Sequence, residues 1–172
     1  RTESELLNLT SAQATSNHTF QFDPVKSTIA FFIAETIRKC VADNDLDNVT
    51  YTFLSSEINR LNASEDCSLF PIEFMVSFTE LLGFQPLVEN DGLIFDLDEG
   101  IINHSNSRLN RTAEGEHIRL ITALIVGRTV NGIIDREVRE KALETLMAYY
   151  QIHTPRLKKF ETYEIIREIL SE

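Results

Sequence analysis

The chain has 172 residues, of which 42% are hydrophobic and 25% charged, and its formal net charge at pH 7 is −11. The composition is that of a globular protein of single-domain length and excludes a disordered chain. No apolar run approaches the roughly 20 residues that a membrane-spanning helix needs. A surface this acidic repels phosphate backbones at long range, which excludes a protein that wraps nucleic acid over its whole surface.

The N-terminal stretch 1–21 is rich in Ser, Thr, Asn and Gln, and we expect it to be a linker or loop ahead of a helical domain over 22–172. It has no apolar run of the kind that a signal peptide carries. Cys40 and Cys67 are too few for a disulfide framework or a four-cysteine zinc site, and both suit a reducing cytoplasm. We expect Cys40 to be a small core residue and Cys67 to have no role.

Asp23 and Pro24 predict the start of the first helix, because Asp accepts a free backbone N–H at the cap and Pro has a suitable φ at the first helical position. Apolar residues then recur at three- and four-residue steps for about 18 residues, and 44–48 ends the helix. A second helix is expected from Val49 to Leu61.

A third helix, from Leu69 to Leu82, is apolar on more than one side, which is typical of the central helix of a bundle. Gly83 suits the left-handed position that ends a helix, and Pro86 prevents the helix from resuming.

Residues 93–102 predict a small β-hairpin, because two short apolar runs flank Asp98 and Glu99. Asp96, Asp98 and Gly100 also resemble the start of a calcium loop. The glycine comes one position early and no Glu closes the loop, so the pattern favours hairpin turn chemistry.

Three more helices follow in the prediction. Thr112 is expected to cap a helix that runs from 113 to 126. Asp135 is expected to cap a helix that runs to 152, and Thr162 is expected to cap a short last helix. The predicted fold is therefore all-α, a bundle of about six helices with one small β-hairpin insertion. We expect these residues to share one core: Ile33, Phe74, Phe78, Leu82, Ile121, Leu124 and Leu146.

No motif for catalysis is present, since the chain lacks a Gly-rich phosphate loop and a nucleophile elbow. Glu114 and His117 have the spacing of half a di-iron site, but no second such pair occurs. The spacing favours a first-turn Glu beside a surface His. We therefore predict no enzyme, no metal and no cofactor.

The sequence Asn-x-Ser/Thr occurs six times, which supports an alternative function as an all-α interaction domain of a secreted or surface glycoprotein. The other explanation is that these residue types gather at helix caps and loops. A signal peptide in the parent reading frame would decide for the alternative. The asparagines are Asn8, Asn17, Asn48, Asn62, Asn103 and Asn110.

Arg156, Lys158 and Lys159 form the densest short basic cluster near the C-terminus. One interpretation is a solvated connector whose charges favour the C-terminal end of the fifth helix. The other is a binding site for an acidic peptide or a phosphate, next to an apolar groove beside that helix.

Three blocks, 22–35, 81–86 and 149–170, resemble in order and spacing the helical C-terminal region of the bacterial DNA-repair protein RecO, in the form of Bacteroides-like bacteria. The first block is similar to the family's first long helix, the second to its helix-end motif and the third to its terminal block. The resemblance covers roughly residues 20–172.

This resemblance implies a non-enzymatic mediator of DNA repair and homologous recombination in the cytoplasm. RecO proteins bind DNA, partner RecR and help load RecA onto DNA covered by single-stranded DNA-binding protein. The acidic tail of that binding protein docks on a partly apolar, basic-rimmed groove of the helical domain.

In the family, an OB-fold domain ahead of the helical part makes the main contacts to DNA and RecR. The resemblance therefore makes 1–21 the end of such a domain and this region a scaffold and partner-docking module. Many members carry a four-cysteine zinc element after a motif like Gly83-Phe84-x-Pro86. Here 92–100 contains no cysteine, so zinc is expected to be absent.

Overall fold

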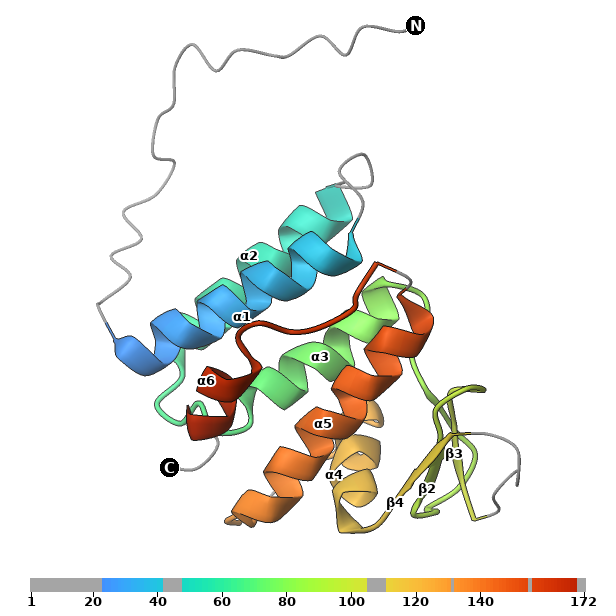
Figure 1. Ribbon diagram of the computed structural model, residues 1–172. Helices are drawn as coiled ribbons and strands as arrows, with labels where there is room; N and C mark the ends of the chain where they lie inside the picture. The colour runs from blue at the N-terminus through green and yellow to red at the C-terminus, as the bar shows by residue number, and fades with distance from the viewer. Residues whose placement is uncertain (1–22, 42–47, 105–110, 131, 155, 170–172) are drawn as a thin grey trace, which may run out of the picture.

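The computed structural model describes residues 23–41, 48–104, 111–130, 132–154 and 156–169 (Figure 1), so the expected linker 1–21 lies outside the described residues. The described helices are α1 (Pro24–Cys40), α2 (Asn48–Ala63), α3 (Phe70–Leu81), α4 (Glu116–Ile125), α5 (Arg136–His153) and α6 (Tyr163–Ile169). The described strands are β1 (Leu87–Val88), β2 (Ile94–Asp96), β3 (Ile101–Asn103) and β4 (Thr112–Glu114).

The prediction of an all-α fold is only partly right, because a small four-stranded sheet stands beside the helices (Figure 1). The predicted hairpin is confirmed: β2 and β3 pair antiparallel, with Phe95 opposite Ile102. Two further strands flank it, β1 parallel to β3 and β4 antiparallel to β2, which gives the order β1-β3-β2-β4. The fold is therefore mostly helical with a minor sheet.

The prediction that Thr112 caps the fourth helix is wrong. Thr112 begins β4, where Ala113 lies opposite Phe95, so the β2 ladder engages this backbone instead of a helix. Gly115 follows with φ 135°, a conformation that other residues rarely adopt, and it lets the chain turn from strand to helix before Glu116.

The same turn changes the surroundings of His117. Glu114 lies in the strand, so it does not share a helix face with His117, which was the premise of the di-iron spacing. The expected surface histidine is also wrong, since His117 is only 7% exposed. Burial, and then the charge of Lys141, lower the pKa of His117.

The predicted start of α1 and the predicted end of α3 are confirmed. Asp23 accepts the backbone N–H groups of Val25 and Lys26 at 2.9 and 3.1 Å. Gly83 adopts φ 79°, and the N–H of Phe84 reaches back to the carbonyl of Thr79 at 3.0 Å. This pattern closes a helix with a left-handed residue.

Two other predicted caps have the expected position but not the expected bond. Asp135 precedes α5 without a side-chain capping hydrogen bond. Thr162 precedes α6, but its hydroxyl donates to Glu35 on α1.

α3 is central, as predicted, and packs against α1, α2, α4 and α5. Of the seven expected core residues, five are fully or almost fully buried: Ile33, Phe74, Phe78, Ile121 and Leu146. Leu82 and Leu124 are only partly buried, because they lie at helix ends where the core meets solvent. Cys67, expected to have no role, is a buried core residue, while Cys40 is partly buried and burial raises its pKa to about 11.

The hairpin turn is built by hydrogen bonds, as the turn interpretation predicted. Asp96 Oδ1 accepts the backbone N–H groups of Asp98 and Glu99 at 3.1 and 3.0 Å. Gly92 is needed for a close approach, since a Cβ there would lie 1.8 Å from the carbonyl oxygen of Asn103. A ring nitrogen of His153 lies 2.8 Å from the carbonyl oxygen of Leu97, which joins the sheet to α5.

His153 thus joins the 87–103 region to α5, and this region contains no cysteine that could bind zinc. Elemental analysis of protein purified without chelator should therefore find zinc well below one atom per chain. Stoichiometric zinc that survives dialysis would contradict this prediction.

Candidate functional site

The predicted basic cluster lies on the segment that leaves α5 and returns across the helices to α6 (Figure 1). We call residues 156–162 the strap. Leu157 and Phe160 are 3% and 2% exposed, and the Phe160 ring packs 5.6 Å from that of Phe32. Arg156, Lys158 and Lys159 are exposed. The strap thus buries its apolar side chains and turns its three cations to solvent.

These three cations differ from most of the other basic side chains of the described chain. Most of the others lie within 3.6 Å of a carboxylate, namely Lys39, Arg60, Arg111, Arg119, Arg128, Arg136, Lys141 and Arg167. Within the described residues, no carboxylate forms an ion pair with Arg156, Lys158 or Lys159, nor with Arg38 on α1. An anionic ligand would meet charges here that no described carboxylate already neutralises.

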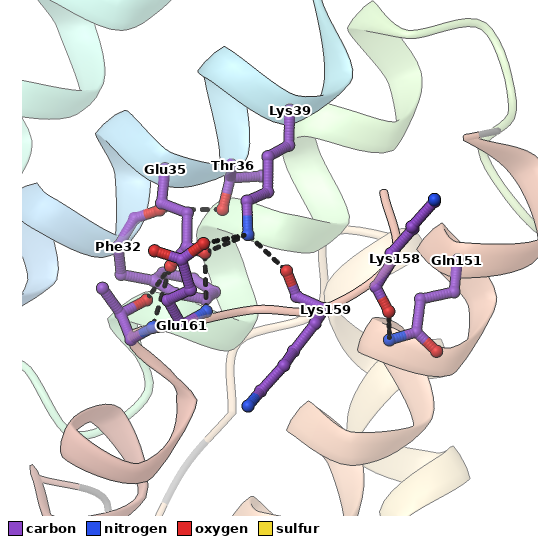
Figure 2. A network of polar contacts seen from close by, with 9 residues as sticks. Phe32, Glu35, Thr36, Lys39, Gln151, Lys158, Lys159 and Glu161 are labelled. Carbon is purple, nitrogen blue, oxygen red and sulfur yellow. Dashed lines mark hydrogen bonds and ion pairs between the residues drawn. The ribbon is translucent and has the colours of Figure 1, made fainter. Parts of the chain in front are cut away.

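Two residues of α1 hold the strap in place (Figure 2). Glu35 accepts hydrogen bonds from the backbone N–H groups of Glu161 and Thr162 at 2.6 and 2.9 Å, and from the Thr162 hydroxyl at 2.5 Å. Lys39 Nζ lies 2.6 Å from the Glu35 carboxylate and also donates to the carbonyl oxygen of Lys159. We call Glu35 and Lys39 the clamp.

The clamp carboxylate is buried and ionised. Burial by itself would raise the pKa of Glu35, but the hydrogen bonds from Glu161, Lys39 and Thr162 outweigh it and lower the pKa to about 2. Sequence reasoning missed this residue, although a Glu and a Lys four residues apart beside the apolar stripe of a helix were a signal for it.

A hollow of about 560 Å³ opens between α1 and α6, next to the strap. Its apolar lining includes Phe31, Ala34 and Ile165, and Phe31 and Ile165 are 69% and 52% exposed. Arg38 lines it as well, and so do the carboxylate-bearing Glu35 and Glu161. We call this hollow the α1–α6 groove. It combines exposed apolar side chains with a nearby cation.

A second hollow, about 430 Å³ in volume, contains Arg119 and Arg128 beside α4. Each of these arginines already lies near a carboxylate, Glu116 at 3.3 Å and Asp91 at 3.4 Å. The strap is the better candidate for an anionic ligand.

Comparison with known proteins identifies the family. The profile described as "Recombination protein O C terminal" matches residues 21–160. The chain belongs to the RecO C-terminal family. It is 27% identical over 161 residues to the DNA repair protein RecO of Flavobacterium psychrophilum, a match that covers 92% of this chain and 67% of that protein.

Two further relatives carry the same name. The RecO protein of Flavobacterium johnsoniae is 28% identical over 160 residues, covering 89% of this chain and 65% of the relative. That of Christiangramia forsetii is 23% identical over 167 residues, covering 94% and 69%. The chain therefore spans about two thirds of the length of these relatives. No solved structure matches it.

The resemblance seen in the sequence is thus confirmed, and the chain's role lies in DNA repair and recombination. None of these matches supports the alternative of a secreted or surface protein. Among the described residues, no helix is long and apolar enough to cross a membrane.

Proposed function

We propose that this chain is a non-enzymatic scaffold and partner-docking module of a cytoplasmic recombination mediator, and that its strap binds an acidic peptide. The observation that carries the proposal is the set of exposed strap cations, Arg156, Lys158 and Lys159, without an ion pair to any described carboxylate in a chain of net charge −11. By the family resemblance, the peptide is the tail of single-stranded DNA-binding protein.

Charge favours a short acidic peptide over nucleic acid as the ligand of this region. A long phosphate backbone would run over a surface that is acidic as a whole, whereas a peptide needs only a local positive field. The α1–α6 groove supports the same ligand, because Phe31 and Ile165 offer apolar contact to a peptide side chain while Arg38 adds charge. Contacts to DNA and RecR are assigned to the OB-fold domain of the family.

Reversing two strap charges in the variant Lys158→Glu/Lys159→Glu should abolish binding of a short fluorescein-labelled peptide of aspartates ending in phenylalanine. Both side chains are exposed, so the thermal midpoint of unfolding should stay nearly unchanged. Fluorescence anisotropy at low salt measures the binding. Added salt should weaken binding to the unaltered chain, since exposed charges are screened beyond about 10 Å at 0.1 M salt.

A matched control is Arg136→Glu/Lys141→Glu, which makes the same change of net charge at two exposed positions on α5. It should bind the peptide nearly as well as the unaltered chain. If the strap variant also binds normally, the strap is only a solvated connector. If the affinity for the peptide does not change with salt concentration, the peptide binds at an apolar surface elsewhere.

A further inference from the structure

The strap has two kinds of anchor, and they hold different parts of it. The apolar side chains of Leu157 and Phe160 are buried in the core. The backbone after Phe160 is held instead by Glu35, which accepts the N–H groups of both Glu161 and Thr162. Without that carboxylate these donors would lose their acceptor, which is costly for backbone groups in a partly buried place.

We propose that Glu35 is the positioning residue of the docking surface: it fixes the strap against α1, the helix that carries Arg38, and so fixes where Lys158 and Lys159 present their charges. This inference rests on the proposed function and gives a role to Glu35, which lines the α1–α6 groove but acts on the peptide through the strap. Glu35 is 7% exposed, and its two oxygens already meet three donors of the strap and the ammonium of Lys39.

Lys39 makes the clamp two-sided. Its ammonium group meets the Glu35 carboxylate and the carbonyl oxygen of Lys159, while Glu161 Oε1 lies 3.5 Å away (Figure 2). The clamp therefore holds the backbone on both sides of the buried Phe160. Arg38, the residue before Lys39 on α1, lines the α1–α6 groove together with Glu161 and Thr162 of the strap. Lys39 also neutralises the clamp carboxylate, which would otherwise repel an acidic ligand.

We call the strap seated when it lies against α1 as in this structure. The seated strap should favour binding of the peptide, and bound peptide should favour the seated strap. A peptide that contacts both the strap and α1 gains its full set of charges only when the strap lies against α1. Its apparent affinity then scales with the fraction of molecules in which the strap is seated. By reciprocity, bound peptide should also hold the strap more firmly on α1.

The first measurement tests the clamp without any ligand. In Glu35→Gln, one carboxylate oxygen becomes an N–H₂ group that faces the strap donors, and the pair with Lys39 loses its charge. Hydrogen exchange at the amides of Glu161 and Thr162 should speed up by about tenfold or more, because these groups then exchange through local opening. Amides in the middle of α3 should keep their protection. Unchanged exchange at Glu161 and Thr162 would overturn the inference.

The second measurement is anisotropy with the aspartate peptide described above. Glu35→Gln should raise the dissociation constant by about tenfold, in proportion to the loss of seated strap. The matched control is Glu57→Gln, which removes another buried carboxylate, 8% exposed and paired with Arg60 at 2.7 Å, on a different helix. It should leave peptide affinity unchanged.

A double-mutant cycle separates positioning from a general loss of stability. In the background Lys158→Gln/Lys159→Gln, the strap has two charges fewer to position, so Glu35→Gln should weaken binding much less than in the unaltered chain. Equal weakening in both backgrounds would mean that Glu35 acts by another route, and the inference would fall.

The two proposals fail in different ways. If the unaltered chain binds the peptide and strap charge reversal abolishes binding, but Glu35→Gln binds normally, only the positioning role is refuted. If the unaltered chain does not bind the peptide, the proposed function fails and the positioning role fails with it, whatever the exchange rates show about the clamp.

Discussion

Replacing Phe78 with alanine is expected to lower the free energy of unfolding by about 3–5 kcal/mol, the usual cost of removing a buried aromatic ring. Phe78 is fully buried on the central helix α3, and its ring stacks 5.3 Å from that of Phe74 and 5.8 Å from that of Phe53 on α2. The variant removes the transfer free energy of the ring and leaves a cavity that its stacked neighbours fill only in part. Urea denaturation of both proteins measures the difference.

Phe31→Ala is the control, because it deletes the same side chain at a position that is 69% exposed. It should change the free energy of unfolding by no more than about 0.5 kcal/mol, as is usual for surface substitutions. A small loss for Phe78→Ala, close to that of the control, would show that α3 is not the centre of the core.

The helices were predictable because their signals are local. Asp23 caps α1 and Gly83 ends α3 through bonds that reach no more than a few residues along the chain. Apolar periodicity then tells which face of each helix is buried. Interactions of this kind depend on a short stretch of sequence, so they can be predicted without knowing the fold.

The two outer strands were not predictable for the opposite reason. β1 has only two residues and β4 is Thr-Ala-Glu, without an apolar run like those that predicted the hairpin, and both exist because they pair with the hairpin. In the sequence, Thr112 is followed by a helical pattern of apolar residues, and Thr before such a pattern is typical of a helix cap. The ladder to β2, set by residues 16 positions earlier at Asp96, overrode it.

The candidate site also has one part that could be predicted from the sequence and one part that could not. The strap cations Arg156, Lys158 and Lys159 stand out in the sequence as a cluster, and their role remains a proposal. The clamp could not be assigned, because Glu35 finds its partners 126 and 127 residues along the chain. In the sequence alone, Glu35 and Lys39 are equally well explained as a solvent-exposed pair on a helix.

Glu35→Gln is expected to lower the free energy of unfolding by about 3 kcal/mol at pH 7, with the loss disappearing as the solution is made acidic. The pKa of Glu35 is about 2 in the folded chain, against an ordinary value of 4.5. Each unit of pKa difference corresponds to about 1.4 kcal/mol, which gives the size of the effect. The side chain is only 6% exposed, so solvent screening reduces it little.

The sign follows from the protons bound in each state. Because the folded pKa is depressed, the unfolded chain binds the proton first, and the stabilisation is fully present above about pH 4.5. It is lost as the pH falls through 4.5 toward 2. The difference between the unaltered chain and Glu35→Gln should therefore be constant from pH 7 to 5 and shrink below that, as urea denaturation at a series of pH values will measure.

The pair of Glu137 and Lys141 on α5 is the matched control for this prediction. It has the same four-residue spacing and nearly the same N–O distance, 2.7 Å against 2.6 Å, but both side chains are exposed. Glu137→Gln should leave stability nearly unchanged at every pH, because exposed ion pairs contribute little. If the loss in Glu35→Gln does not vary between pH 5 and 2, the ionised carboxylate is not what holds the strap, and the shape of the side chain and its neutral hydrogen bonds must account for the contact instead.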